Sequence, residues 1–590
     1  MSTGTRQRFR QIVFIPRGTP TAAMPDAPAV SWQRFRALGA VTALYACALL
    51  TTAARHIADT TVYVHDILLF DKGSFEHYPN PIWEFGHLYW RPIGWVLFKW
   101  FGGLTPFAAS GLEKLVATTV LFSFTMLCGF VCALLFYSMA SALLGHRWKA
   151  LLVTAGMLGC YSFLNYVQSG APYIPGLMGL LGALWAVIRA VDSGKFSWQY
   201  GLLSGALFAF SVLMWLPYIV VLPGILAAAI FWGKPGAAPM QRRVRLASWV
   251  FFSAAGLTAL GYLAVILQLK FLSFAEMQAW MLASSHGWSQ NKRLLRMVSG
   301  LPRSFLYNGE GGMALKRYLL KDPYAPVTLG DLIRQHLWAP MIFYTFALCL
   351  IGVLWRSLDG RRVLWICLAA TIPALAFAAF VFESGSLERY LPLYPFICLA
   401  IAHGLSQLPT KTAAPVVILA FVLLAIAVNG SSLSKSRIDA EIAPSVARLE
   451  SLRGKVTSEG LVVLTAIPDS LYWLLTIYPF HPANRGETIV PYDVIQTANE
   501  RIVRWQPDFA KRALDTLSRS QSVWVSKRLL ADRPEPAWGW TEGDDPHISW
   551  KKLPAFFRQF SYSESVGGAD GFLKLEPENK TKLEAVAVGI

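Results

Sequence analysis

Long apolar runs alternate with short polar segments over the first three quarters of the chain. The first run covers residues 37–54, and the others lie at about 115–144, 150–168, 172–190, 200–214, 216–232, 247–269, 337–355, 363–382, 390–407 and 413–430. A helix needs about 20 consecutive apolar residues to cross the hydrocarbon core of a bilayer. The pattern therefore predicts a polytopic α-helical membrane protein with about eleven transmembrane helices.

The stretch 200–232 admits two interpretations, because Pro217 and Pro223 interrupt it. Either two short spans meet at a break, or a single helix is kinked at a proline. We favour two spans, since the basic loops that follow then stay on one side of the membrane. A single span would invert every later loop and place Arg242, Arg243 and Arg245 outside.

The rest of the chain divides into an arm, a membrane domain and a tail. The arm covers residues 1–36, the membrane domain 37–434 with long outer segments at 55–114 and 270–335, and the tail 435–590. In the tail, a helical stretch at 443–452 is followed by strand-like runs at 461–465 and 522–525. This mixture predicts a small C-terminal α/β domain.

Charge is scarce and unevenly placed. Charged residues make up 15% of the chain and hydrophobic residues 54%, whereas a soluble chain carries about 25% charged residues. The net charge of +18 raises the question of nucleic acid, but from Lys435 onward basic and acidic residues balance at 20 each. The excess lies in the arm and in short loops, which indicates topology determinants and no nucleic-acid partner.

The same loops predict the orientation. With the N-terminus in the cytoplasm, the inner loops hold 12 Lys and Arg residues, opposed only by Asp192 and Asp359. Basic residues concentrate on the cytoplasmic side of short loops. We therefore expect a multi-pass protein of the inner (plasma) membrane, in contact with membrane lipids, whose C-terminal domain is extracytoplasmic.

The first outer segment is dense in groups that can move protons. It holds His56, Asp59, His65, Asp66, Asp71, Glu76, Glu84, His87 and Arg91. A carboxylate held just above the bilayer beside apolar groups is suited to act as a general base. The alternative is that these are solvated loop charges. The apolar stretch 92–109 is expected to lie in the interface as an amphipathic helix.

The second outer segment is basic, against the usual distribution. Between Lys270 and Arg334 it holds nine Lys and Arg residues against four acids. Cations near the outer headgroups suit a lipid phosphate, and the candidates are Lys292, Arg293, Arg296, Arg303, Lys316, Arg317 and Lys321. The alternative is an amphipathic helix that touches anionic lipid. Arg389 lies at headgroup height, and its alternative role is an ion pair with Glu388.

Two short motifs add a resemblance to this layout. The first is Val64-His65-Asp66-Ile67-Leu68-Leu69 followed by Leu88-Tyr89-Trp90-Arg91-Pro92, and the second is Leu387-Glu388-Arg389-Tyr390-Leu391-Pro392-Leu393-Tyr394-Pro395. Over residues 37–430 the chain resembles the GT-C superfamily of integral membrane glycosyltransferases, particularly the group of protein O-mannosyltransferases and aminoarabinose transferases. Many of these relatives have paired acids where this chain has His65-Asp66, so the partner acid is open between Asp59, Asp71 and Glu84.

The resemblance implies a GT-C-type glycosyltransferase whose donor is a sugar linked to a polyprenyl phosphate. An aspartate would take the proton from the hydroxyl of an extracytoplasmic glycan, lipid or protein acceptor, and a single displacement would invert the anomeric carbon. Asp66 is the expected base, with Asp59 and Glu84 as the other catalytic candidates. The expected phosphate ligands are Arg91, Arg303, Lys316, Arg317, Lys321 and Arg389, with His65, His87 and Glu388 beside them.

A divalent metal ion is a further expectation, because some relatives use one near the acidic residue. His65 with Asp66, or Glu84 with His87, offers suitable ligand types, although neither spacing is diagnostic. All seven cysteines lie inside apolar runs, so the sequence contains no cysteine-based zinc motif. No other cofactor is implied.

Two other functions fit parts of the sequence. A transporter or lipid flippase is one, since broken helices occur at substrate sites of transporters and the region of Pro217 is a candidate break. It would usually show internal repeats and ionisable residues at mid-membrane depth, neither of which stands out here. The other is a membrane scaffold whose neutral tail binds a partner.

Overall fold

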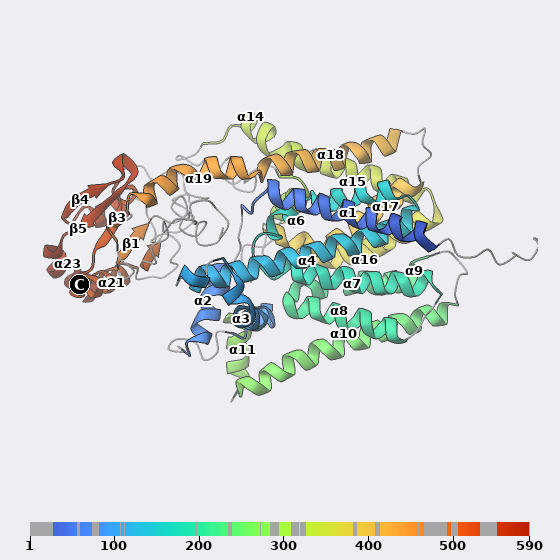
Figure 1. The fold of residues 1–590 in the computed structure, drawn as a ribbon, viewed down its shortest axis with the longest axis horizontal. Coiled ribbons are helices and arrows are strands. Elements are labelled where there is room, and N and C mark those ends of the chain that lie inside the picture. The colour runs from blue at the N-terminus through green and yellow to red at the C-terminus, as the bar shows by residue number, and fades with distance from the viewer. Residues whose placement is uncertain are drawn as a thin grey trace, which may run out of the picture.

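The computed structural model describes residues 27–55, 60–73, 82–106, 108–110, 113–194, 198–233, 239–271, 273–283, 294–307, 318, 326–381, 386–407, 413–452, 454–456, 460–464, 493–496, 505–531 and 552–588. A bundle of long helices occupies one side of the molecule and a small sheet the other, with short helices between them (Figure 1). The N-terminal residues 1–26 of the predicted arm lie outside the described part.

Most of each predicted apolar run lies in helices of the bundle, which are α1 (Ala27–Thr51), α4 (Glu113–Leu144), α5 (Arg147–Leu158), α6 (Tyr161–Tyr166), α7 (Tyr173–Asp192), α8 (Trp198–Met214), α9 (Leu222–Phe231), α10 (Met240–Leu269), α15 (Trp338–Trp355), α16 (Leu358–Phe380), α17 (Tyr394–Gln407) and α18 (Ala413–Ser432). Helices form here because lipid leaves backbone groups no other hydrogen-bond partners. Within the described ranges, five of them (α4, α7, α10, α15 and α16) are long and apolar enough to cross a membrane. The exact number of crossings stays a prediction. Helix α1 begins at Ala27, within the segment predicted as the polar arm.

The stretch around Pro217 consists of two antiparallel segments. Helix α8 ends at Met214, and the chain continues through the 3₁₀ helix η4 (Leu216–Val221) into α9. The indole N–H of Trp232, just past α9, donates to Asp192 at the end of α7 (3.1 Å). Since α8 begins next to that end of α7, α9 runs back toward the end of the bundle at which α8 begins. The break is therefore a turn between two segments.

Short elements gather at the end of the bundle nearest the sheet. They are α2 (Thr60–Asp71), η1 (Phe85–His87), α3 (Trp90–Phe101), α11 (Phe274–Ala283), α12 (Leu294–Phe305) and η6 (Leu387–Leu393). Helices α2 and α3 pack on each other and on α4, and α12 packs on η6. Figure 1 shows α2, α3 and α11 at this end. Helix α3 exposes Trp100 and Phe101, which agrees with an amphipathic helix at the interface.

The tail begins with α19 (Lys435–Glu450) and contains a five-stranded sheet of order β2-β1-β3-β5-β4. The strands are β1 (Leu461–Leu464), β2 (Asp493–Gln496), β3 (Val523–Ser526), β4 (Tyr562–Val566) and β5 (Phe572–Leu575). Strands β2, β1 and β3 are parallel, whereas β5 pairs antiparallel with both β3 and β4. Side chains alternate between the two faces, and Val463 and Val525 meet α21 (Trp505–Ser518) on one of them.

Candidate functional site

Arg91 lies between two carboxylates from different parts of the first outer segment. Its Nη2 is 3.1 Å from Oδ2 of Asp66, which lies on α2, and 2.8 Å from Oε2 of Glu84, which directly precedes η1. Arg91 is 8% exposed and Glu84 5%. When ionised, the three side chains of Asp66, Glu84 and Arg91 together carry one net negative charge. Such a group is suited to accept a proton.

The rings of Tyr63 and His87 pack beside this ion cluster. Tyr63 precedes Asp66 by three positions on α2, so both side chains lie on one face of the helix. The guanidinium of Arg91 lies over the Tyr63 ring, 5.6 Å from its centroid. The Tyr63 hydroxyl is 3.2 Å from Nε2 of His87, whose Nδ1 is 3.3 Å from the carbonyl oxygen of Met214. Because a carbonyl only accepts, Nδ1 donates to Met214, and in the neutral imidazole Nε2 then accepts from Tyr63.

A continuous path of rings joins this cluster to the late motif. The ring of His87 packs against Tyr173 at 6.3 Å, and Tyr173 packs against Trp215 at 4.8 Å, both edge to face. The guanidinium of Arg389 lies over Trp215, 5.2 Å from its centroid. Asp66 and Arg389 are therefore at the same end of the bundle. These contacts connect the two motifs, although Asp66 and Arg389 are more than 300 residues apart in the sequence.

Glu388 and two arginines make up the part of the site around the late motif. The Tyr166 hydroxyl donates to Oε2 of the buried Glu388 at 2.6 Å, whereas the Nη2 of Arg389 is 3.8 Å from Oε1 of Glu388. The ion pair considered as the alternative role of Arg389 is therefore present, at a separation longer than a hydrogen bond. Arg303 on α12 lies near enough to Tyr390 to interact with it electrostatically, as does Arg389. One cation of the basic segment thus reaches η6.

Asp71, the third acid considered from the sequence, belongs to another contact. Its Oδ1 accepts from the indole N–H of Trp95 at 3.0 Å and pairs with Lys99. Partial burial alone would raise the pKa of Asp71, but the hydrogen bonds from Lys99 and Trp95 outweigh it and lower that pKa below its usual value. A carboxylate with this partner is a weak base, so among the described acids Glu84 is the one that accompanies Asp66, whereas Asp59 lies outside the described residues.

The other sequence-derived candidates have different outcomes. Asp59, Lys292, Arg293, Lys316, Arg317 and Lys321 lie outside the described residues, as does the side chain of Arg296. His65 is exposed, whereas Asp66 is half-buried, because consecutive residues of a helix face different directions. The two therefore do not form one ligand pair.

The described residues do not fit a divalent metal. Among the described ranges, no three His, Cys, Asp or Glu side chains gather in one place. Both ring nitrogens of His87 are engaged by Tyr63 and Met214, and the two nearby carboxylates bind a guanidinium. No step through a metal is derived from them.

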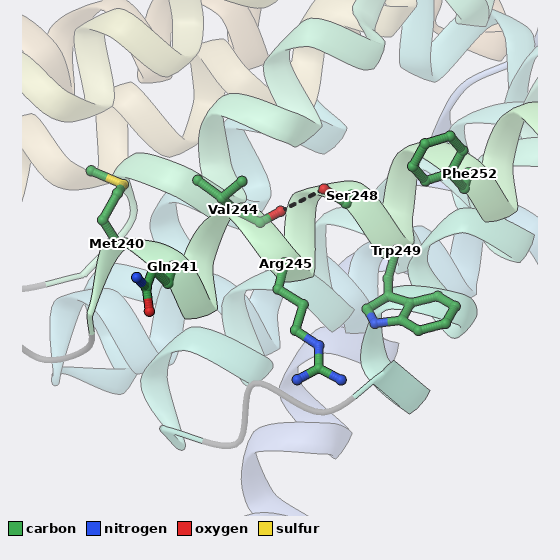
Figure 2. Close-up of a pocket in the computed structure, with 7 residues that line it drawn as sticks. All are labelled: Met240, Gln241, Val244, Arg245, Ser248, Trp249 and Phe252. Carbon is green, nitrogen blue, oxygen red and sulfur yellow. Dashed lines mark hydrogen bonds between the residues drawn. The ribbon is translucent and has the colours of Figure 1, made fainter.

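A shallow hollow elsewhere has no part in this site. It follows one side of the N-terminal half of α10 and is lined by Met240, Gln241, Val244, Arg245, Ser248, Trp249 and Phe252 (Figure 2). Its walls come from a single helix. It begins at the end of α10 opposite to Tyr262, the residue that contacts η1.

Sequence reasoning missed the aromatic residues of the site. Tyr63, Tyr166, Tyr173 and Trp215 lie in or beside apolar runs, where aromatic residues are common at the membrane interface. Only the spacing of Tyr63 from Asp66 gives a local signal, since it places both on one helix face. The contacts of the others join segments that are distant in sequence.

Comparison with known proteins gives one family match. Residues 106–282 match the model of the dolichyl-phosphate-mannose-protein mannosyltransferase family. The matched stretch runs from just before α4 to α11, so it holds Tyr173 and Trp215 but neither Asp66 nor Arg389. A search among curated protein sequences gives no match.

Three solved structures resemble the chain at low identity. ArnT from Cupriavidus metallidurans bound to undecaprenyl phosphate has 12% identity and a TM-score of 0.46, covering 93% of this chain and 98% of that one. Its apo state has 13% identity, a TM-score of 0.41 and the same coverage. The oligosaccharyltransferase of Archaeoglobus fulgidus has 12% identity and a TM-score of 0.41, covering 90% of this chain and 72% of that one. Over residues 106–282, the family match confirms the resemblance of this chain to GT-C glycosyltransferases that the sequence predicted.

Proposed function

We propose that this chain transfers a sugar from a polyprenyl-phosphate donor to an acceptor hydroxyl at the extracytoplasmic face of the membrane. The observation that carries the proposal is the contact path from Asp66 through Arg91, Tyr63, His87, Tyr173 and Trp215 to Arg389. It supports one site with an acidic side and a cationic side. Those are the two charges that a sugar phosphate and a nucleophilic hydroxyl require.

Asp66 is the proposed base. Its side chain is 15% exposed against 5% for Glu84, so an acceptor reaches Asp66 more readily. As the acceptor oxygen bonds to the anomeric carbon, the bond from that carbon to the phosphate oxygen breaks with its electron pair. The proton of the acceptor hydroxyl passes to Asp66. The configuration at the anomeric carbon inverts because there is a single displacement.

Arg389 and Arg303 are the proposed ligands of the leaving phosphate. Both lie around Tyr390, at the end of the bundle that the loop charges assign to the outer leaflet. One guanidinium group can bind two phosphate oxygens at once through two parallel hydrogen bonds. The roles of Lys316, Arg317 and Lys321 remain predictions. Arg91 pairs with Asp66 and Glu84, which favours a role in holding Asp66 in place rather than a role in binding the donor phosphate.

The acceptor is a glycan, lipid or protein outside the cytoplasm. The tail with its sheet follows α18 through α19 (Figure 1), and with the N-terminus inside, the loop charges place it on the same face as Asp66. A soluble domain at that position is suited to contact an acceptor. The host membrane is proposed to be the inner (plasma) membrane.

Transfer of a labelled sugar by the purified protein in liposomes tests the proposal. With a polyprenyl-phosphate sugar as donor, Asp66→Asn should lower the rate by about 10²–10⁴-fold, the usual contribution of a general base. Asp71→Asn is the matched control on the same helix and should change the rate by no more than about twofold, since the Asp71–Lys99 pair is partly exposed. Full activity of Asp66→Asn would remove the proposed base, and equal losses in both variants would contradict the assignment.

A further inference from the structure

The position of Glu84 is not explained by its own segment. Residues 82–84 have no regular secondary structure, and Glu84 does not cap η1 through its side chain. Even so, Glu84 is 5% exposed and lies 2.8 Å from Arg91. A carboxylate in irregular backbone keeps such a position only when other elements hold that backbone.

Two aromatic side chains hold the peptide groups on either side of Glu84. The indole N–H of Trp280 donates to the carbonyl oxygen of Trp83 at 2.8 Å. The hydroxyl of Tyr262 donates to the carbonyl oxygen of Phe85, also at 2.8 Å. Both donors are partly buried, so each hydrogen bond restrains the carbonyl group that accepts it.

Ring packing reinforces these hydrogen bonds. The ring of Phe85 lies 5.1 Å from Tyr262 and 5.3 Å from Trp280. Beyond η1, the backbone N–H of Tyr89 donates to the carbonyl oxygen of Leu213 at 3.0 Å. The segment is therefore held from the side of α10 and α11 before it and from α8 after it.

The two donors come from elements far along the chain. Tyr262 lies near the end of α10 and Trp280 on α11, at separations of 177 and 197 residues from their partners. Lys270 ends α10 with a left-handed backbone conformation (φ 52°), which turns the chain toward α11. Helix α11 packs on η1, and Figure 1 shows it next to the end of α10.

We propose that Tyr262 and Trp280 form a clasp that positions Glu84, and through Arg91 the base Asp66, for sugar transfer. Neither side chain touches the substrate in this account, so both are positioning residues. The inference rests on the proposed function and adds the start of the basic outer segment to the machinery of the acidic site. Docking of α11 then controls whether the acid pair is correctly assembled.

The kinetic test uses variants that lose only the donor atom. Tyr262→Phe should lower kcat by about fivefold, the effect of one lost hydrogen bond, while KM for the polyprenyl-phosphate donor stays unchanged. Trp280→Phe should also lower kcat, and it replaces Tyr262→Phe in the test if that variant does not fold. Tyr562→Phe is the matched control, because it loses an equivalent hydrogen bond to a carbonyl at 2.8 Å in the tail.

A double-mutant cycle separates positioning from general damage. In a Glu84→Gln background, Tyr262→Phe should cause no further loss of kcat, because there is no longer a carboxylate to position. A full fivefold loss in that background would overturn the proposal. So would wild-type kcat in both single variants.

A third measurement does not depend on activity. Ile82 is 2% exposed in the same segment, so a cysteine at Ile82→Cys, in a chain without its native cysteines, should react slowly with a maleimide. The combined change Tyr262→Phe and Trp280→Phe should raise that rate at least about tenfold, by opening the segment. Unchanged labelling overturns the clasp, whereas absence of sugar transfer by the wild-type protein with normal labelling overturns only the proposed function.

Discussion

Arg91 is the residue on which the geometry of the acidic site depends. It reaches Asp66 and Glu84 with one nitrogen and stacks over Tyr63. A guanidinium can serve two carboxylates and an aromatic face together because it is planar and carries several donors. Replacing it leaves two carboxylates of like charge in a largely buried position.

Arg91→Met should therefore lower the free energy of unfolding by about 3–5 kcal/mol, the usual effect of breaking a buried ion pair. The free energy of unfolding of Arg91→Lys should lie between those of this variant and the wild type, since an ammonium group keeps the charge but not the planar set of donors. Thermal unfolding of the purified protein in detergent measures both effects.

Lys99→Met is the control on the same helix. Lys99 pairs with Asp71, but its side chain is 49% exposed, so its loss should destabilise the protein by less than about 1 kcal/mol. Equal shifts in melting temperature for Arg91→Met and Lys99→Met would contradict the central position given to Arg91.

At the residue scale, the sequence predicted the charged groups better than their partners. The acids Asp66 and Glu84 and the cation Arg389 were found because charge is rare at a membrane surface and groups of it stand out. The sequence predicts Arg91 as a phosphate ligand, because residue type alone does not show whether an arginine binds the phosphate of a donor or a neighbouring carboxylate. Tyr262 and Trp280 had no local signal, since their contacts join segments far apart.

At the scale of elements, the helices followed from the apolar runs and the short outer pieces did not. A run of apolar residues has one outcome in lipid, which is a helix. In the basic segment the sequence predicted charge without structure. The structure adds that α12 is docked by its end, where Ser304, Phe305 and Leu306 are buried, and this docking brings Arg303 to η6.

Asn429 on α18 is one polar anchor of that docking. Its side-chain amide donates to the carbonyl oxygens of Gly159 and Phe305 and accepts from the backbone N–H of Tyr307, each at 2.7 Å. Asn429→Ala leaves these three buried groups without this partner and should destabilise the end of α12 by about 3 kcal/mol. Hydrogen–deuterium exchange at 303–307 should become faster.

Asn579 in the tail gives a matched control. It is 2% exposed and likewise makes three hydrogen bonds to backbone groups, two to Ser561 and one to Glu576. Asn579→Ala should speed exchange around Ser561 and leave 303–307 unchanged. Unchanged exchange at 303–307 in Asn429→Ala would show that α12 is held without Asn429, by its apolar contacts and by the hydrogen bonds of Ser304 to Ser162 and Tyr394.

At the scale of the whole molecule, the account requires both motifs to lie outside the cytoplasm. The structure places Asp66 and Arg389 at one end of the bundle, and the distribution of basic loops assigns that end to the outer face. This orientation in the membrane follows from the basic loops and not from the fold. It decides whether a donor in the outer leaflet can meet the acidic cluster.

Cysteine labelling in right-side-out membrane vesicles tests this claim most directly. In a chain without its native cysteines, Lys72→Cys at the end of α2 and Ser386→Cys at the start of η6 should both react with a membrane-impermeant maleimide. Arg147→Cys, exposed at the start of α5, should react only after the vesicles are opened. Reaction of the first two from opposite sides of the membrane would contradict a shared site for sugar transfer.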